Sequence, residues 1–206
     1  EAEKNLQLAL SICLKRLASN HVDVGRTFYH LGLLQSFLAN RQQAKEYLEK
    51  ARIILLEKLG TEHVEVARVY RCMGVVRYKL GDHREAEKNL LLALSIYLEK
   101  LAPNHVDVGR TYYHLGFLQR LLTNMQQAKK YLEKAHSVLL ENLGTEHVEV
   151  AHVYDCMGVV AYALGENHQA KKHFELALSI FKKHLGPDHQ DVKQTTTSLR
   201  LCDNSP

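Results

Sequence analysis

The sequence predicts an all-α fold, a solenoid of about ten helices stacked as antiparallel pairs. Three observations support this prediction. The segment HVDVGRTFYHLG at 21–32 returns every 42 residues, at 63, 105 and 147, and in degenerate form at 189. Apolar residues such as Ala44, Leu48, Ala51 and Leu55 follow helical spacing, and strand alternation is absent. A single helix pair cannot bury its own apolar face, so neighbouring repeats must stack on one another.

Each repeat holds two helical segments separated by recurring breaks. The connectors LGTEH at 59 and 143 and LGPDH at 185 end the second helix of a unit, and LGDH at 80 and LGEN at 164 separate its two helices. We therefore expect one solenoid over 1–206, which begins with an orphan second helix at 1–18 and closes with a capping helix at 189–202. The predicted helix pairs between them are 21–60, 63–101, 105–143 and 147–185.

Small residues recur at fixed positions of both helices, where they would let the two helices of a pair approach closely. First helices carry a glycine in each repeat: Gly32, Gly74, Gly116 and Gly158. Second helices carry two alanines in each repeat: Ala44, Ala86, Ala128 and Ala170, then Ala51, Ala93, Ala135 and Ala177. Larger apolar residues beside them are expected to fill the space between the helices.

Composition and charge exclude several classes of protein. Charged residues make up 24% of the chain and hydrophobic residues 46%, which is typical neither of a disordered chain nor of a membrane protein. No apolar run approaches the roughly 20 residues that span a bilayer. The net charge of +4 favours acidic partners but is too small to indicate nucleic-acid binding. We therefore expect neither a membrane nor a nucleic-acid partner.

The cysteines and the first residues indicate where the protein works. Cys13, Cys72, Cys156 and Cys202 form no C-x-x-C pair, and free thiols fit a reducing compartment. The opening stretch EAEKNLQLALSICLKRLA has acid at its front and reads as an amphipathic helix, not as a signal peptide. The chain does not begin with Met, so we expect a fragment of a larger cytoplasmic protein.

No pattern of residues predicts catalysis, a cofactor or a metal. The eleven glycines read as caps, turns and packing contacts, not as a phosphate-binding loop. Cys72 and Cys156 occupy an apolar repeat position, which favours buried inert thiols over nucleophiles. The five connector histidines lie one per repeat, too far apart to share an ion, and are expected to pack the connectors: His21, His63, His105, His147 and His189. We therefore predict a protein that is not an enzyme.

These positions resemble the tetratricopeptide repeat (TPR). The segment MGVVRYKLGDHREAEKNLLLAL at 73–94 matches that pattern, as do the ring residues four positions before each small residue: Phe28, Tyr70, Tyr112 and Tyr154. The 42-residue period and the LGxxHxxV connector resemble the kinesin light chain and nephrocystin type. The resemblance covers nearly the whole chain. It implies a right-handed superhelix that serves as a protein-interaction scaffold, with first helices lining a concave groove.

The resemblance also implies which residues contact a peptide, namely the second, fifth, ninth and twelfth of each first helix. These positions lie roughly on one face of a helix. The predicted groove residues are Arg26, Tyr29, Leu33, Arg68, Arg71, Val75, Tyr78, Arg110, Tyr113, Phe117, Arg120, His152 and Asp155.

The chemistry of these residues predicts the kind of peptide that the groove would bind. Arginine offers a planar fork to carboxylates, and tyrosine offers broad apolar contact with a polar tip. The strip therefore suits an extended peptide with acidic and bulky apolar residues. Kinesin-light-chain-like repeats usually carry Asn at the fifth position, whereas this chain has Tyr29, Arg71, Tyr113 and Asp155 there. The alternative interpretation is an ordinary solvated inner face, with binding of folded proteins through other faces.

The two ends of the chain lead to a second functional hypothesis, self-assembly. The helix at 1–18 would expose one apolar side, which includes Leu6, Leu10 and Leu14, so a homodimer through this segment is an alternative function. The last segment, TTTSLRLCDNSP, replaces the ring residue by Thr196 and the small residue by Arg200. Repeat arrays need a polar cap of this kind at an end.

The repeats occur in two alternating versions of the sequence, or spellings: the units that start at 21 and 105 share the first, and those that start at 63 and 147 share the second. Residues 1–84 and 85–168 agree at 61 of 84 positions, far more than adjacent 42-residue units do. The simplest explanation is duplication of a block of two units. A second interpretation is that the two spellings line the groove with different chemistry.

Overall fold

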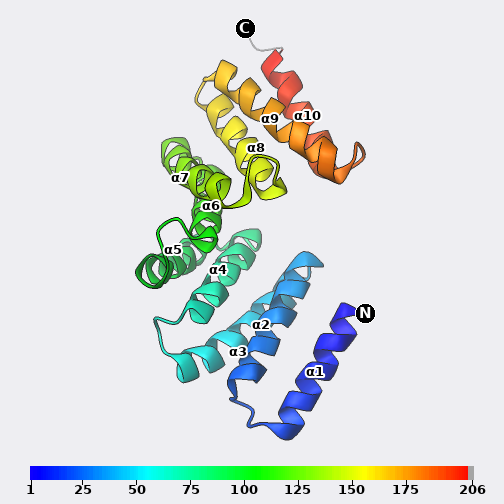
Figure 1. Ribbon diagram of the computed structural model, residues 1–206, viewed down its shortest axis with the longest axis vertical. Helices are drawn as coiled ribbons and strands as arrows, with labels where there is room; N and C mark the ends of the chain where they lie inside the picture. Colours follow the sequence, from blue (N-terminus) through cyan, green and yellow to red (C-terminus); the bar gives the residue numbers. More distant parts are fainter. Residues whose placement is uncertain (204–206) are drawn as a thin grey trace. The chain divides into compact units, whose positions relative to one another are not determined.

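The computed structural model describes residues 1–203 and consists there of ten α-helices joined by short connections (Figure 1). This confirms the predicted all-α fold and number of helices. The helices are α1 (Ala2–Arg16), α2 (Val22–Phe37), α3 (Arg41–Leu59), α4 (Val64–Lys79), α5 (His83–Lys100), α6 (Val106–Leu121), α7 (Met125–Leu143), α8 (Val148–Ala163), α9 (Asn167–Leu185) and α10 (Gln190–Asp203).

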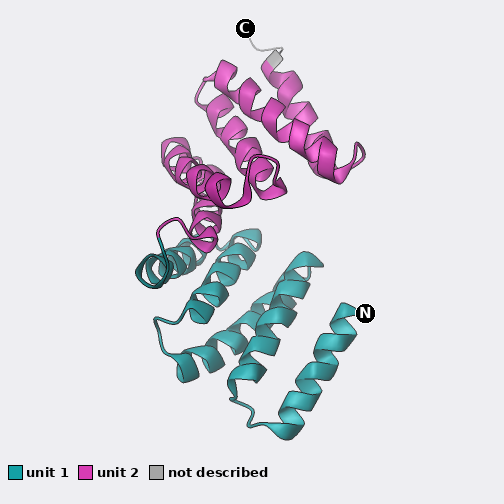
Figure 2. Cartoon of the chain, in the orientation of Figure 1, with its two compact units in different colours: residues 1–102 teal, residues 103–206 magenta. Residues whose placement is uncertain are grey.

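Consecutive helices pack as pairs, α2 with α3, α4 with α5, α6 with α7 and α8 with α9. Helix α1 packs on α2, and α10 packs on α9. The chain divides into two compact units, residues 1–102 and 103–206, which Figure 2 shows in two colours. Unit 1 holds α1 to α5 and unit 2 holds α6 to α10. A single solenoid over the whole chain stays a prediction.

The connector histidines begin the first helices. In each case the imidazole Nδ1 accepts a hydrogen bond from the backbone N–H two residues later, at 3.1–3.3 Å. This satisfies one of the amide groups that the first turn of a helix leaves without an intrahelical partner. The expected structural role of these histidines is therefore confirmed, and its form is an N-cap: His21, His63, His105, His147 and His189.

The spacing of small residues that recurs in each repeat produces close contact within each pair. A Cβ added at Gly74 would lie 2.6 Å from Leu90 Cγ and 3.1 Å from the carbonyl oxygen of Ala86. The equivalent contact in unit 2 is Gly158 against the ring of Phe174, also at 2.6 Å. The glycines thus receive a large apolar side chain from the second helix. The alanines of the second helices are fully buried beside them, as predicted.

The turns between the two helices of a pair use left-handed backbone conformations. Gly81 and Gly165 have φ of 87° and 78°, whereas Ala39 and Thr123 occupy the same repeat position with φ of 61° and 60°. A side chain with a Cβ is strained in this region, and a β-branched one more so. The first spelling of the repeat therefore retains strain that the second spelling avoids.

Replacing Thr123 by glycine is expected to stabilise unit 2 by about 1 kcal/mol, because the relief of left-handed strain exceeds the entropy that glycine adds to the unfolded chain. Urea denaturation of the full chain measures the change. The matched variant Gly165→Thr should lose a similar amount. A destabilised Thr123→Gly variant would contradict this explanation.

The first helix of the described chain, α1, exposes several large apolar side chains. Leu8, Ile12 and Leu14 of α1 are 59%, 44% and 46% exposed, whereas Ile96, the copy of Ile12 on α5, is only 7% exposed. Leu6 and Leu10 are partly covered by the rest of unit 1. Self-assembly through this helix stays a prediction.

Helix α10 carries polar residues at positions where the earlier first helices contact the second helix of their pair. Lys193 and Arg200 replace Ala151 and Gly158 of α8, and both are exposed. Residues 204–206 of the predicted capping segment lie outside the described residues.

Candidate functional site

The predicted groove residues lie on first helices that are neighbours within each unit. Helices α2 and α4 lie side by side in unit 1, and α8 lies beside both α6 and α10 in unit 2. Each unit therefore presents its own strip of these side chains. The two strips differ in how deeply their residues are buried and in what the charged groups contact.

Two of the predicted groove arginines join consecutive repeats. Arg26 donates from Nε and Nη2 to the two carboxylate oxygens of Glu65 at 2.8 and 2.7 Å. Arg110 forms the same fork with Glu149, with both distances 2.8 Å. The hydrogen bonds from Arg26 lower the pKa of Glu65 below its ordinary value. These guanidinium groups thus hold a carboxylate of the chain itself, and their contact with a peptide stays a prediction.

The repeated sequence contains a signal for these charge pairs between consecutive repeats. An acidic residue follows each connector histidine by two positions, and for Glu65 and Glu149 the arginine partner lies 39 residues earlier, at Arg26 and Arg110. At the last step His152 takes the place of arginine, with Nε2 3.9 Å from Asp191 Oδ2. The ring of His152 also packs on Phe181, with centroids 5.0 Å apart. Comparing residues one repeat apart could have revealed this pairing.

The strip of unit 1 is largely part of the core. Tyr78 is only 8% exposed, and Tyr29 and Leu33 pack against the buried cluster formed by α3 and α4. The Cys72 thiol lies 3.8 Å from the Tyr29 hydroxyl, and burial raises the pKa of that tyrosine. Arg71 and Val75 are half-buried on α4, and Arg68 is exposed near its start.

The strip of unit 2 combines aromatic rings with a cation. The rings of Tyr113 and Phe117 have centroids 6.3 Å apart on α6, and both are half-buried. The Arg120 guanidinium carbon lies 4.5 Å from the centre of the Phe117 ring, a cation–π geometry. Contact with the ring restricts the rotamers of Arg120, which reduces the entropy that its planar fork loses on binding a ligand.

Asp155 adds a carboxyl group to this strip from α8. It accepts a hydrogen bond from the hydroxyl of Thr195 on α10 at 2.7 Å. Burial raises the pKa of Asp155 above its ordinary value, although that hydrogen bond and the nearby Arg120 and His152 act in the opposite direction. The structure therefore brings four predicted residues together in one strip, of which Arg120 is the cation: Tyr113, Phe117, Arg120 and Asp155.

The buried thiols do not have the environment of catalytic cysteines. Cys72 and Cys156 are 7% and 4% exposed, and burial raises the pKa of Cys156 to about 12. A thiol that stays protonated at neutral pH is a weak nucleophile. Among residues 1–203, no group of three or more His, Cys, Asp or Glu side chains could hold a metal ion. No helix in the described part of the chain is long and apolar enough to cross a membrane.

Two histidines of unit 2 lie on either side of Tyr154. His136 Nε2 is 2.9 Å from the Tyr154 hydroxyl, and the Tyr154 and His173 rings stack with centroids 6.0 Å apart. Burial lowers the pKa of both histidines below the ordinary value of about 6.5. In unit 1, the equivalent positions 84 residues earlier hold Arg52 and Asn89.

Acidification is therefore expected to destabilise unit 2. The unfolded chain protonates these imidazoles at a higher pH than the folded chain does, so stability falls as the pH drops through about 6.5. The double variant His136→Arg/His173→Asn, which introduces the residues of the equivalent positions in unit 1, should show a smaller loss between about pH 7.5 and 5.5. Urea midpoints at the two pH values test this, and Asp155 titrates equally in both proteins. Equal pH dependence in both proteins would refute it.

The comparisons with known proteins agree with this architecture. Family models described as tetratricopeptide repeat match residues 65–141, 110–183 and 25–51, together more than half of the chain. Among solved structures, BtubC (BKLC) from P. vanneervenii is similar with a TM-score of 0.76 and 19% identity, over 98% of this chain and 80% of that one. A comparison with curated proteins gives no match.

Two further structures share the fold at low identity. A putative kinesin light chain of P. anserina with nearly identical TPR-like repeats has a TM-score of 0.71 and 20% identity, over 88% of this chain and 86% of that one. The apo form of RapI has a TM-score of 0.66 and 19% identity, over 87% of this chain and 48% of that one. These likenesses concern the fold alone.

Proposed function

Because the chain belongs to the tetratricopeptide repeat family, whose members generally mediate interactions between proteins, we propose that it binds a peptide segment of another protein. The binding surface is the first-helix strip of unit 2, formed by Tyr113, Phe117 and Arg120 of α6 with Asp155 and Val159 of α8. The peptide carries an acidic residue beside a bulky apolar one. The strip of unit 1 is a second, more deeply packed candidate surface.

The stacked arrangement of Arg120 on Phe117 carries this proposal. A guanidinium ordered over a ring offers its donors to a carboxylate with little entropy left to lose. The half-buried rings of Phe117 and Tyr113 offer apolar area next to it, and aromatic and arginine side chains are enriched in binding hot spots. Arg26 and Arg110 hold carboxylates of their own chain, so they contribute less to a peptide site than Arg120 does.

A selection from a displayed peptide library tests the proposal. The full chain is screened at low and high salt, with Arg120→Gln as the counter-screen. We expect an enriched pattern that pairs an acidic with a bulky apolar residue, binds more weakly at high salt and is lost on Arg120→Gln. If nothing is enriched, or if the same peptides bind both proteins equally, the proposed peptide site is wrong.

A second candidate function is self-assembly through α1, which the exposure of Leu8 and Ile12 favours. Leu8 and Ile12 lie one turn apart on the same face of α1, and adjacent exposed apolar side chains of this kind mark an interaction surface. Light scattering of the full chain should then give a mass that rises with concentration, and Leu8→Glu/Ile12→Glu should hold the protein monomeric. A wild-type mass that is monomeric at every concentration would exclude this function.

A further inference from the structure

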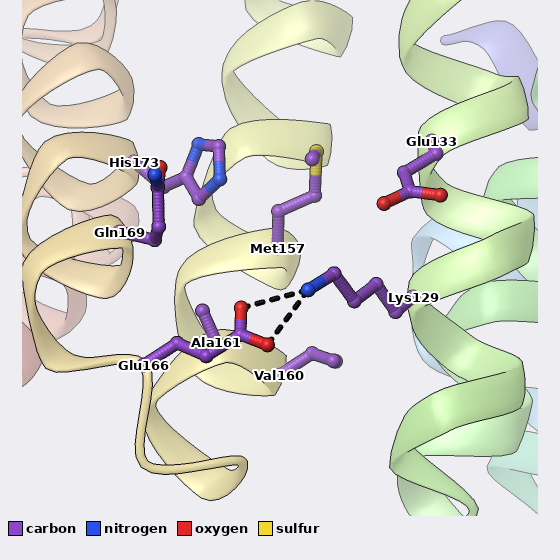
Figure 3. Close-up of a pocket in the computed structure, with 8 residues that line it drawn as sticks. All are labelled: Lys129, Glu133, Met157, Val160, Ala161, Glu166, Gln169 and His173. Carbon is purple, nitrogen blue, oxygen red and sulfur yellow. Dashed lines mark hydrogen bonds and ion pairs between the residues drawn. The ribbon is translucent and has the colours of Figure 1, made fainter.

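Unit 2 contains a cavity of about 360 Å³ on the side of α8 that faces the second helices (Figure 3). Lys129 and Glu133 of α7 lie on one side of it, and Glu166, Gln169 and His173 lie on the other, at the start of α9 and just before it. Met157, Val160 and Ala161 of α8 also line it. None of these residues belongs to the proposed peptide strip, so the cavity is a separate feature of the molecule.

The corresponding place in unit 1 is occupied by an arginine of the chain itself. A smaller cavity of about 280 Å³ lies there among α3, α4 and α5, and Arg77 of α4 is one of its residues. The Arg77 Nη2 donates to Glu49 Oε1 at 2.8 Å, and its Nη1 donates to Asp82 Oδ2 at 3.1 Å. With its side chain only 15% exposed, Arg77 joins the two carboxylates across the site.

The duplicated block keeps the carboxylates and loses this arginine. At an offset of 84 residues, Glu49 becomes Glu133 and Asp82 becomes Glu166, whereas Arg77 becomes Ala161. A second guanidinium is lost nearby, because Arg52, which donates to Glu49 at 2.9 Å, becomes His136. Glu85 on the rim becomes Gln169. Unit 2 therefore retains a two-carboxylate site without the guanidinium that fills its copy.

Lys129 donates hydrogen bonds to only one of the two carboxylates, that of Glu166 and not that of Glu133. Its Nζ contacts both oxygens of Glu166, at 2.7 and 2.8 Å, as the dashed lines in Figure 3 show. Within residues 1–203, no hydrogen bond or ion pair reaches Glu133. The Nδ1 atom of His173 is shielded from solvent and also has no hydrogen-bond partner in the described part of the chain. Both groups can accept a hydrogen bond, and the ammonium of Lys129 donates to Glu166 instead of to them.

We propose that this cavity binds an arginine side chain of a partner protein. In unit 2, the guanidinium of the partner occupies the position that is equivalent to that of the Arg77 guanidinium in unit 1. It donates to Glu133 and reaches His173 Nδ1, and the aliphatic part of the side chain packs on Met157. Arg77 supplies the internal precedent, since the same fold with the same carboxylates already holds this group. A planar group with five N–H donors suits acceptors on opposite walls better than a compact ammonium does.

The test uses Nα-acetyl-arginine N-methylamide as the probe and the methionine methyl groups of the full chain as reporters. Met157 lines this cavity, Met73 lines its copy in unit 1, and Met125 is the remaining methionine. We expect a saturable NMR shift at Met157 alone. The neutral citrulline analogue should bind at least about tenfold more weakly, because it loses the charge-assisted hydrogen bond to Glu133.

Two matched variants distinguish this site from general weak binding. Ala161→Arg should fill the cavity from within and remove the Met157 response, and Arg77→Ala should open the copy so that Met73 begins to respond. If Ala161→Arg fails to fold, Glu133→Gln replaces it and should weaken binding about tenfold. An equal response to the citrulline or lysine analogue, or a Met157 response that survives Ala161→Arg or Glu133→Gln, would overturn the proposal. The peptide site on Phe117 and Arg120 is unaffected by either result.

Discussion

Replacing Gly74 by valine is expected to destabilise unit 1 by about 3 kcal/mol, the upper range for overpacking a close-packed core. A Cβ at this position meets Leu90 Cγ at 2.6 Å, and the Ala86 carbonyl at 3.1 Å prevents the backbone from moving away. Leu90 is completely buried, so it has no free rotamer into which it can turn. The pair α4 and α5 must therefore separate.

Urea denaturation of the full chain, followed by circular dichroism, measures this loss. Ser95→Val on the exposed side of α5 is the control for placing valine in a helix, and it should cost less than about 1 kcal/mol. Adding Leu90→Ala to Gly74→Val should cost less than the sum of the two single changes. A Gly74→Val variant as stable as the Ser95→Val control would disprove the close contact.

Replacing Phe117 by alanine is expected to weaken binding of the selected peptide about thirtyfold, or about 2 kcal/mol. The ring supplies apolar contact area and also holds Arg120, whose guanidinium carbon lies 4.5 Å from the ring centre. Removal of the ring therefore affects both the apolar and the acidic residue of the peptide.

Isothermal titration calorimetry measures this change. The matched control is Leu176→Ala, which removes a large apolar side chain that is 38% exposed on the second helix α9. It should change the affinity less than twofold, a difference of about 0.4 kcal/mol. Circular dichroism of both variants checks that the fold is retained. If the two variants bind the peptide equally well, Phe117 is not part of the binding surface.

The fold could be predicted from the sequence because its signals are local and repeated. A glycine such as Gly74 appears at the same place in four of the five first helices, and a histidine such as His63 starts all five. Helix boundaries follow from these caps and breaks, and the structure agrees with them to within a few residues. Five copies of one pattern supply more information than a single helix can.

The details of the site depend on contacts that the pattern alone does not contain. The partner of Arg26 is Glu65, 39 residues away, and the helical period gives no reason to prefer it over a peptide carboxylate. The stack of Arg120 on Phe117 depends on side-chain rotamers, which the spacing of residues leaves open. The cavity beside Ala161 is caused by a missing side chain, so it appears only when the two 84-residue blocks are compared in three dimensions.

A crosslink map is the most direct measurement of the central claim, that a peptide binds to the first helices of unit 2. A selected peptide with a photoreactive benzophenone next to its acidic residue is irradiated with the full chain, and mass spectrometry locates the adducts. We expect adducts on α6 and α8, close to Phe117 and Val159, and their loss when the unlabelled peptide competes. Adducts confined to the second helices α7 and α9 would contradict the account.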